Sequence, residues 1–343
     1  MSSPLTISAV ADAVNPAIQK MWLKVASKMP TYYDKMYHVT TGVTDLFSRE
    51  SNLSGYKSAS RVVENAVILA QSPIQGFDQT FEQVKYGTIA GFTDKVWKFA
   101  IKKRDLEGIV KELKEACIMR REELLARKYD AAFLSAYTES DDAGNYSVTT
   151  TGGDAVAMAS ASHTREDGGT AWSNIVSDGT TSNMNLDYPA LKALKRIGSL
   201  VKTPRGKPWT MDYNRIVVKE GTAAHMRALE ILGALKNNKI PGEFSNDGAA
   251  VSTFELVANP WLLGTGDATS TTNLSSATNF HAIDTRYLSE KCGPQYMENT
   301  PISLSAEPHV IFKTDEIQWK STMWFAYGHA DARCTAHSSG ANA

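Results

Sequence analysis

The feature that most limits how this chain can fold is a long segment without helix breakers. Neither glycine nor proline occurs between Ile109 and Ala143, and Asp105 is a suitable N-cap at the start of the segment. The pattern predicts one helix over residues 105–137. Such a helix would be roughly 48 Å long at about 1.5 Å per residue, which is typical of a spine in a flat or extended domain.

The side chains of this segment predict which face of the helix is buried. One apolar stripe falls at helical spacing: Leu106, Ile109, Val110, Leu113, Ala116, Cys117, Leu124, Ala131 and Leu134. Arg120 interrupts the stripe. The opposite face, which we expect to be exposed, carries Lys111, Glu112, Lys114, Glu115, Arg121, Glu122 and Lys128.

The segment before this helix has the composition of strands. The runs "RVVENAVIL" (residues 61–69) and "KVWKFAI" (residues 95–101) are rich in β-branched and aromatic residues. In the second run, Trp97, Phe99 and Ile101 alternate with Lys or Ala, which is the period of a half-exposed strand. Few large apolar residues lie between the two runs. We therefore predict a long hairpin that projects from the body of the protein.

Helices and strands alternate after the spine helix. A second helix is predicted to begin at Asp187, with Pro189 in its first turn, and a third in "GTAAHMRALEILGAL". "NRIVVKE" and "FELVANPWLL" are predicted strands, and the second ends in a proline turn. Residues 264–276, rich in glycine, serine and threonine, are expected to form a flexible loop.

The two ends of the chain carry weaker patterns. Ile18, Met21, Trp22 and Val25 lie at helical spacing and predict a short helix in an extended arm. Near the other end, "STMWFAYGHADARCTAH" alternates as a strand does. The final "SSGANA" is expected to be disordered.

Charge, hydropathy and cysteine content exclude several classes of protein. Lys and Arg number 36 against 37 Asp and Glu, which argues against a protein whose main task is to grip nucleic acid, although local contact with DNA stays open. No apolar run is long enough to predict a membrane span, and the N-terminus lacks the pattern of a secretory signal. Cys117, Cys292 and Cys334 are too few and too far apart for a disulfide framework, so we expect a reducing interior such as a cytoplasm.

One polar segment invites a catalytic interpretation. "VAMASASHTREDGGTAWSNIV" (residues 156–176) brings serines, a histidine and an aspartate together among glycines. A cytoplasmic α/β hydrolase would use Ser162 as nucleophile and His163 as base. Adjacent residues seldom reach one another in that way, however, and no G-x-S-x-G motif precedes them. We favour the alternative that these small polar residues build turns, and we predict no catalytic residue.

A metal site and a cofactor site were weighed in the same way. His329, Cys334 and His337 are residue types that bind zinc, but no second paired motif accompanies them. The phosphate-binding pattern G-x-x-x-x-G-K-[ST] is absent. We predict no metal and no cofactor.

The order of the segments resembles the major capsid proteins of tailed bacteriophages, the Hong Kong 97 fold, and most closely the Mu-type major head subunit. The quoted segments that carry the resemblance are "YGTIAGFTDKVWKFAIKKRDLEGI", "DAVAMASASHTREDGGTAWSN", "NRIVVKEGTAAHMRALEIL" and "STMWFAYGHADARCTAH". They look like the end of the family's extended loop, a scaffold segment, a strand followed by a helix, and the closing strand. The chain departs from the family pattern at Met158, Thr164, Lys219 and Glu220.

The resemblance implies an α+β fold in five parts. These are an N-terminal arm (1–45), an extended β-hairpin loop (46–101), a peripheral domain containing the spine helix (102–187), an axial α/β domain (188–282), and a return to the peripheral domain with C-terminal strands (283–343). In such a subunit His163 would be a packing or hydrogen-bonding residue.

The same resemblance implies a structural function without catalysis. The subunit would assemble into hexamers and pentamers of an icosahedral shell around double-stranded DNA, with non-specific DNA contact and with scaffolding and portal proteins as partners, and without a membrane. It would be made in the host bacterial cytoplasm and reside in the virion. Candidate assembly residues are Lys85, Tyr86, Phe92, Lys102, Lys103 and Arg104. The alternatives are the hydrolase above and an encapsulin-like nanocompartment shell.

Overall fold

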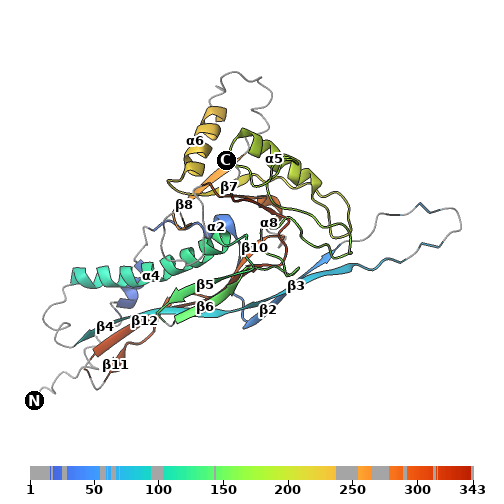
Figure 1. The fold of residues 1–343 in the computed structure, drawn as a ribbon. Coiled ribbons are helices and arrows are strands. Elements are labelled where there is room, and N and C mark those ends of the chain that lie inside the picture. Colours follow the sequence, from blue (N-terminus) through green and yellow to red (C-terminus); the bar gives the residue numbers. More distant parts are fainter. Residues whose placement is uncertain are drawn as a thin grey trace, which may run out of the picture.

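The computed structural model describes residues 16, 18–24, 29–54, 59, 61–62, 67–68, 70–93, 103–142, 144–236, 254–263, 278–288, 292–311, 314 and 316–340. Two β-sheets and the helices packed on them form a wedge, and a two-stranded hairpin runs out sideways from its base (Figure 1). Within the described residues, no helix is both long and apolar enough to cross a membrane.

The larger sheet is built around one long strand. Its members are β1 (His38–Thr41), β4 (Val84–Thr93), β10 (Pro294–Leu304), β11 (His309–Ile311) and β12 (Glu316–His329). One edge of β12 pairs antiparallel with β4, and the other edge pairs with β10 and β11. The predicted closing strand is confirmed as β12, and its alternation holds at Met323 and Phe325, which are buried in the core. The alternation fails beyond them, because Ala326 and Gly328 are buried and Tyr327 is only partly buried.

The spine helix is confirmed, but its end was predicted wrongly. The helix α4 spans Lys103–Asp130 and therefore stops seven residues before residue 137. Tight turns follow, in which Leu134 donates its N–H to the carbonyl of Ala131 at 2.9 Å. The chain then enters a second hairpin of β5 (Ala136–Asp141) and β6 (Gly144–Thr149). The absence of glycine and proline permits a helix but does not require one.

The prediction of an exposed charged face on this helix was also wrong in part. Arg121, Glu122 and Lys128 are buried, because the helix is covered by the larger sheet and by the short helix α2 (Tyr33–Met36). Glu122 accepts backbone N–H groups of Tyr32 and Tyr33 at 2.9 and 3.2 Å, which caps the start of α2. Burial raises the pKa of this carboxyl, and this effect outweighs the two hydrogen bonds, which lower the pKa. Helical periodicity predicts one buried face, and it cannot predict that a second element covers the opposite face.

The projecting hairpin consists of β2 (Phe47–Ser54) and β3 (Ile74–Glu82), which pair antiparallel. The strand predicted over residues 61–69 is wrong where the structure describes it, because residues 61–62 and 67–68 lie outside any strand. β-branched residues favour a strand only where a neighbouring strand completes the ladder. The strand predicted over residues 95–101 lies outside the described residues.

The smaller sheet has the order β13-β9-β7-β8 and forms the upper lobe in Figure 1. Its strands and helices are β7 (Arg215–Lys219), β8 (Glu255–Asn259), β9 (Phe280–Ile283), β13 (Thr335–Ser338), α5 (Tyr188–Leu200), α6 (Ala223–Lys236) and α8 (Thr285–Leu288). The two helices and two strands predicted in this region are confirmed. Asp187 caps α5 by accepting the N–H of Ala190 at 2.8 Å. The loop expected over residues 264–276 lies outside the described residues.

Residues 338–340 are ordered, although the sequence predicted disorder for them. β13 includes Ser338, whose hydroxyl donates to the carbonyl of Met184 at 2.5 Å within the buried interior. Gly340 is also buried, while residues 341–343 lie outside the described residues. A run of small polar residues predicts a disordered tail when it is considered alone. Its burial depends on partners that are distant in sequence, such as Met184.

The short N-terminal helix is confirmed within residues 18–24. Ile18 and Trp22 are buried against Val110 and Leu113 of α4 and against Trp319 of β12. The arm therefore packs in part on its own chain.

Candidate functional site

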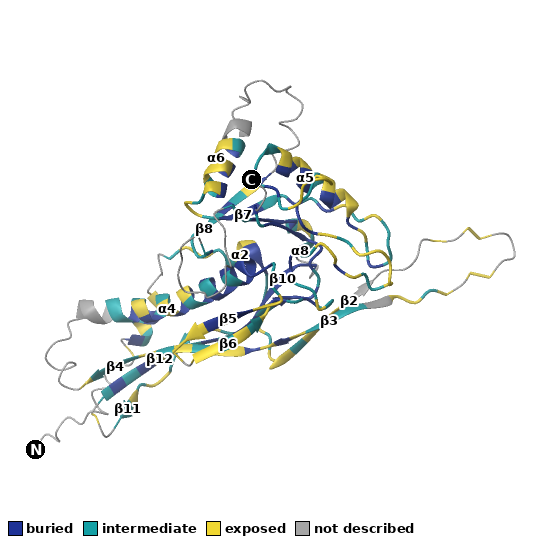
Figure 2. Ribbon diagram, viewed as in Figure 1, coloured by how far each residue is buried: buried dark blue, intermediate teal, exposed yellow. Residues whose placement is uncertain are grey.

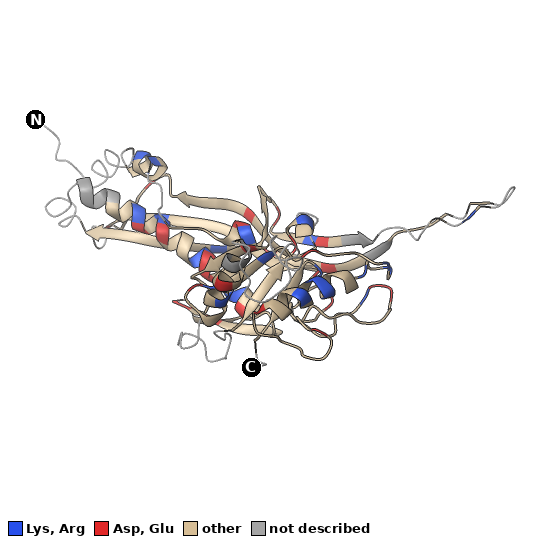
Figure 3. Cartoon of the chain, turned by 90° about the horizontal axis from the view of Figure 1, so that it is seen from above, with Lys and Arg blue, Asp and Glu red and all other residues tan. Residues whose placement is uncertain are grey.

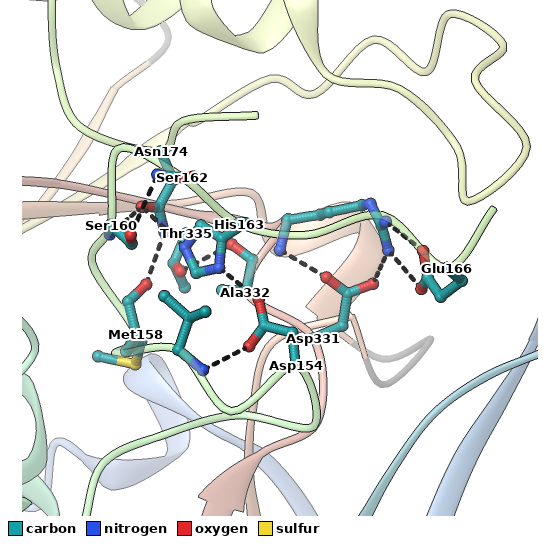
Figure 4. Close-up of polar contacts among 12 residues, drawn as sticks. Asp154, Met158, Ser160, Ser162, His163, Glu166, Asn174, Asp331, Ala332 and Thr335 are labelled. Atoms are coloured by element: carbon teal, nitrogen blue, oxygen red, sulfur yellow. Dashed lines mark hydrogen bonds and ion pairs between the residues drawn. The ribbon is translucent and has the colours of Figure 1, made fainter. Parts of the chain in front are cut away.

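The polar segment with the suspected catalytic residues folds into a network centred on His163 (Figure 4). The ring Nδ1 lies 2.8 Å from Asp154 Oδ2 and the ring Nε2 lies 3.2 Å from Asn174 Oδ1. The imidazole stacks on Trp172 with 4.5 Å between ring centroids and is 1% exposed. Both ring nitrogens thus face partners other than a hydroxyl group.

The neighbouring serines shape turns in this network. Ser160 Oγ accepts the N–H of Ser162 at 3.1 Å, and the N–H of Ser160 donates to Asn174 Oδ1 at 2.8 Å. Asn174 Nδ2 in turn donates to the carbonyl of Met158 at 2.7 Å. A nucleophilic serine must lie within hydrogen-bond reach of its base, and the position beside Nε2 belongs to Asn174. The geometry supports the interpretation of His163 as a packing and hydrogen-bonding residue.

Arg333 forms a second buried network, here called the Arg333 junction, which comprises Arg333, Glu166, Asp331, Trp172 and Lys202. The guanidinium donates to both carboxylate oxygens of Glu166 at 3.2 and 2.8 Å and pairs with Asp331 on its other side. Its Nε donates to the carbonyl of Lys202 at 3.1 Å, and its carbon Cζ lies 5.5 Å from the ring centroid of Trp172. Dashed lines in Figure 4 mark the pairs at Glu166 and Asp331.

This junction joins three parts of the chain that are distant in sequence: the 154–174 segment, the end of α5 and the turn before β13. Arg333 is 2% exposed, and burial raises the pKa of Asp331 against the opposing effect of the guanidinium. In the sequence, Arg333 is a single arginine among small residues. This position is the one sequence feature that could have indicated a structural role for Arg333.

Two residues of the possible zinc set, His329 and His337, are buried histidines, and a third buried histidine is His281. His281 and His337 are opposed on β9 and β13, with 2.9 Å between their Nδ1 atoms. Burial lowers the pKa of His281 to about 3, and it also lowers the pKa values of His329 and His337. Within the described ranges, no group of three or more His, Cys, Asp or Glu side chains is placed to hold a metal ion.

The predicted assembly residues fall on β4 and on the start of α4. Lys85 is exposed, with its Nζ 5.4 Å from the ring centroid of Trp324. Tyr86 stacks on Phe325 at 4.9 Å, and Phe92 packs in the cluster of Ile18 and Trp22.

The basic run is only partly described. Lys102 lies outside the described residues, and Lys103 and Arg104 lie in the first turn of α4, where their side chains are outside the description. Only the side chains of Lys85, Tyr86 and Phe92 are therefore described, and the assembly role of the six candidates stays a prediction.

Exposed stretches lie along the projecting hairpin (Figure 2), and some of them carry apolar side chains that the sequence did not single out. Those on the projecting hairpin and on β4 are Leu46, Phe47, Val62, Val67, Ile68, Val84 and Ile89. Val67 is 84% exposed and Ile68 is 76% exposed. Burial of apolar surface away from water is favourable by about 25 cal/mol per Å². Contact of this part of the molecule with another surface would therefore lower the free energy.

Comparisons with known proteins give a likeness in fold. No protein-family model matches the chain, and no curated protein matches it in sequence. The chain is similar to one in the "Capsid structure of the Cyanophage P-SCSP1u", with a TM-score of 0.54 and 10% identity over 93% of this chain and 90% of that chain. It is also similar to a chain of "Mycobacterium phage Adephagia", with a TM-score of 0.50 and 11% identity over 92% of each chain. At this low identity the likeness concerns the fold, which is the mixed α+β fold of a phage capsid structure.

Proposed function

We propose that this chain is the major capsid protein of a tailed bacteriophage, with a structural and non-catalytic role. The observation that carries the proposal is the likeness to a cyanophage capsid structure over 93% of the chain. A match that covers 93% of this chain and 90% of the other supports a likeness of the whole fold rather than of one common motif. The Hong Kong 97 type of the fold and a Mu-type relationship are part of the proposal and rest on the quoted sequence segments.

The surface of the subunit suits assembly into a shell. The hairpin of β2 and β3 extends from the body and carries exposed apolar side chains, which a neighbouring copy would bury. Contacts between different surfaces of identical subunits generate rings when the rotation closes. We infer hexamers and pentamers of an icosahedral shell. In the proposed division, residues 1–45 form the arm, 46–101 the extended loop, 102–187 and 283–343 the peripheral domain, and 188–282 the axial domain.

The charge distribution fits close packing of many copies. Lys and Arg alternate with Asp and Glu along α4 in Figure 3, and the formal net charge is −1. Like-charged copies would repel one another at short distances, and a near-neutral subunit avoids that cost. The proposed partners are further copies, scaffolding and portal proteins, and packaged double-stranded DNA in non-specific contact.

The proposed location is the virion, after synthesis in the host cytoplasm. Lys85, Tyr86, Phe92, Lys102, Lys103 and Arg104 remain our candidates for assembly contacts.

Neither alternative function gains support. The hydrolase requires a serine at the ring of His163, where Asn174 lies instead. A nanocompartment shell would use the same fold, and the phage capsid likeness favours the virion.

The proposal is tested by negative-stain electron microscopy of the recombinant chain after size-exclusion chromatography, at high concentration and moderate salt. We expect uniform closed shells, or rings of five or six subunits. A chain that stays monomeric under all these conditions and shows a hydrolytic activity that His163→Ala abolishes would contradict the proposal.

A further inference from the structure

A buried lysine lines a cavity that the proposed function does not use. Lys128, near the end of α4, is 3% exposed and borders a cavity of about 270 Å³ between β3, β4, β6 and β12. The aromatic side chains in the cavity wall are Phe81, Tyr86, Tyr146, Phe325 and Tyr327. The cavity thus combines one cationic group with flat apolar walls, a combination typical of sites for small organic ligands.

The lysine lacks the carboxylate partner that two arginines of the same helix have. Its Nζ donates to the carbonyl of Thr149 at 2.6 Å, and it makes no ion pair with any described carboxylate. By contrast, Arg120 and Arg127 on the same helix both pair with Glu139. Burial lowers the pKa of Lys128 to about 7. The charge is therefore costly in this position, and a bound anion would offset that cost.

The described lining of the cavity offers the lysine no carboxylate partner. Among the described residues that line it, Glu82 carries the only carboxylate, and this side chain is exposed at the end of β3 without an ion pair to Lys128. We propose that the cavity binds a carboxylate, which pairs with the Lys128 ammonium while the aromatic walls contact the organic body of the ligand. One lysine supplies one positive charge, which matches a single carboxylate better than a phosphate dianion.

The carboxylate has two possible sources with the same chemistry. It is either a small organic acid from solution or an Asp or Glu side chain of a neighbouring copy; only the second source rests on the proposed shell function. In both cases binding requires the protonated lysine. Since Lys128 loses its proton above about pH 7, the affinity for a carboxylate should fall by about tenfold for each pH unit above that value.

The test uses benzoate as the probe on isolated wild-type subunits, measured by titration calorimetry at pH 6, 7.5 and 9. Benzamide, which has the same ring without the charge, is the matched ligand control. We expect benzoate to bind at pH 6, to bind more than tenfold more weakly at pH 9, and to bind more tightly than benzamide. Lys128→Met should abolish the preference for benzoate. Lys111→Met is the matched protein control, because Lys111 lies on the same helix with a half-exposed side chain that pairs with Glu115.

The Met variant should fold, since Met has a similar length and removes a costly buried charge, while the loss of the hydrogen bond to the Thr149 carbonyl should lower the free energy of unfolding only modestly. Assembled particles then distinguish the sources: they exclude benzoate if a neighbouring copy supplies the carboxylate, and they bind it if the ligand is free. Either result agrees with a carboxylate site. Failure of wild-type subunits to bind benzoate, equal binding of benzamide, or full benzoate binding by Lys128→Met would overturn the proposal. None of these three results would bear on the proposed shell function.

Discussion

The Arg333 junction and the hairpin of β2 and β3 differ in where their side chains find partners. In the junction, the guanidinium of Arg333 meets Glu166, Asp331 and the carbonyl of Lys202, all within the same chain. On the hairpin, Arg49 is largely exposed in its ion pair with the partly buried Asp78, and Val67 and Ile68 contact mainly solvent. The junction therefore satisfies its charges within the subunit, whereas the hairpin leaves apolar side chains exposed, which in the proposed shell a neighbouring copy would bury.

The largest effect should come from a charge placed in the core of the subunit. Leu113 is buried with Ile18, Trp22 and Trp319, so Leu113→Asp would bury an unpaired carboxylate. We expect a loss of about 5 kcal/mol or more in the free energy of unfolding, seen as an insoluble or unfolded chain. The control Leu113→Met should cost less than about 1.5 kcal/mol. A soluble Asp variant that unfolds cooperatively would show that this helix face is not core.

Removal of the junction cation ranks next. Arg333→Met leaves Glu166 and Asp331 buried without their partner, and we expect a loss of about 3–5 kcal/mol in urea denaturation. The matched change on the hairpin, Arg49→Met, removes a surface ion pair and should cost at most about 1 kcal/mol. Equal losses in the two variants would break the comparison.

Acid should weaken the interior with a defined sign. His281, His329 and His337 have pKa values lowered by burial, so the unfolded chain binds more protons than the folded chain below the usual histidine value of about 6.5. The contribution of the histidines to stability is therefore complete above that pH and is lost as the pH decreases toward 3, by at most about 1.4 kcal/mol per pH unit for each histidine. Lys128, which faces His329, titrates near pH 7 in the folded chain and near pH 10.5 in the unfolded chain. Its effect on stability is therefore a rise with pH between these two values, outside the range of the histidines.

Urea denaturation between pH 7 and 5.5 measures this slope. His281→Gln should reduce it, whereas His309→Gln should not, because His309 is exposed on β11. A free energy of unfolding that stays constant over this pH range would contradict the assignment of the buried histidines as neutral.

The smallest effect on stability is expected at the hairpin. The double change Val67→Ser and Ile68→Ser removes exposed apolar surface and should alter the free energy of unfolding by no more than about 0.5 kcal/mol. The same variant should need a higher subunit concentration for assembly, measured by light scattering. A large loss of stability with unchanged assembly would mean that these residues serve the fold.

The sequence predicted the elements whose signals are local. The cap at Asp187, the strand of "NRIVVKE" and the alternation of Met323 and Phe325 all depend on neighbours in the chain, and the structure contains them. The end of α4 and the order of the C-terminal tail depend on distant partners, such as the carbonyl of Met184 for Ser338. The burial of Glu122 has the same cause, because the backbone of Tyr32 and Tyr33 approaches it from far away in sequence.

The site was predictable in kind but not in detail. The spacing of Ser162 and His163 argued against catalysis, and the geometry around Asn174 agrees. No periodic pattern could show that Asp154 and Asn174 flank the ring of His163, nor that Arg333 bridges Glu166 and Asp331. These contacts arise when loops and strand ends from three parts of the chain come together.

The most direct test of the account replaces residues 55–73, which join β2 to β3, with a short Gly-Ser turn and compares the variant with wild type by sedimentation velocity and urea denaturation. The account predicts a subunit whose free energy of unfolding changes by less than about 1 kcal/mol and which does not form shells or rings under conditions where wild type does. Shells of wild-type size and yield from the shortened chain would contradict the claim that the hairpin exists for a neighbouring copy.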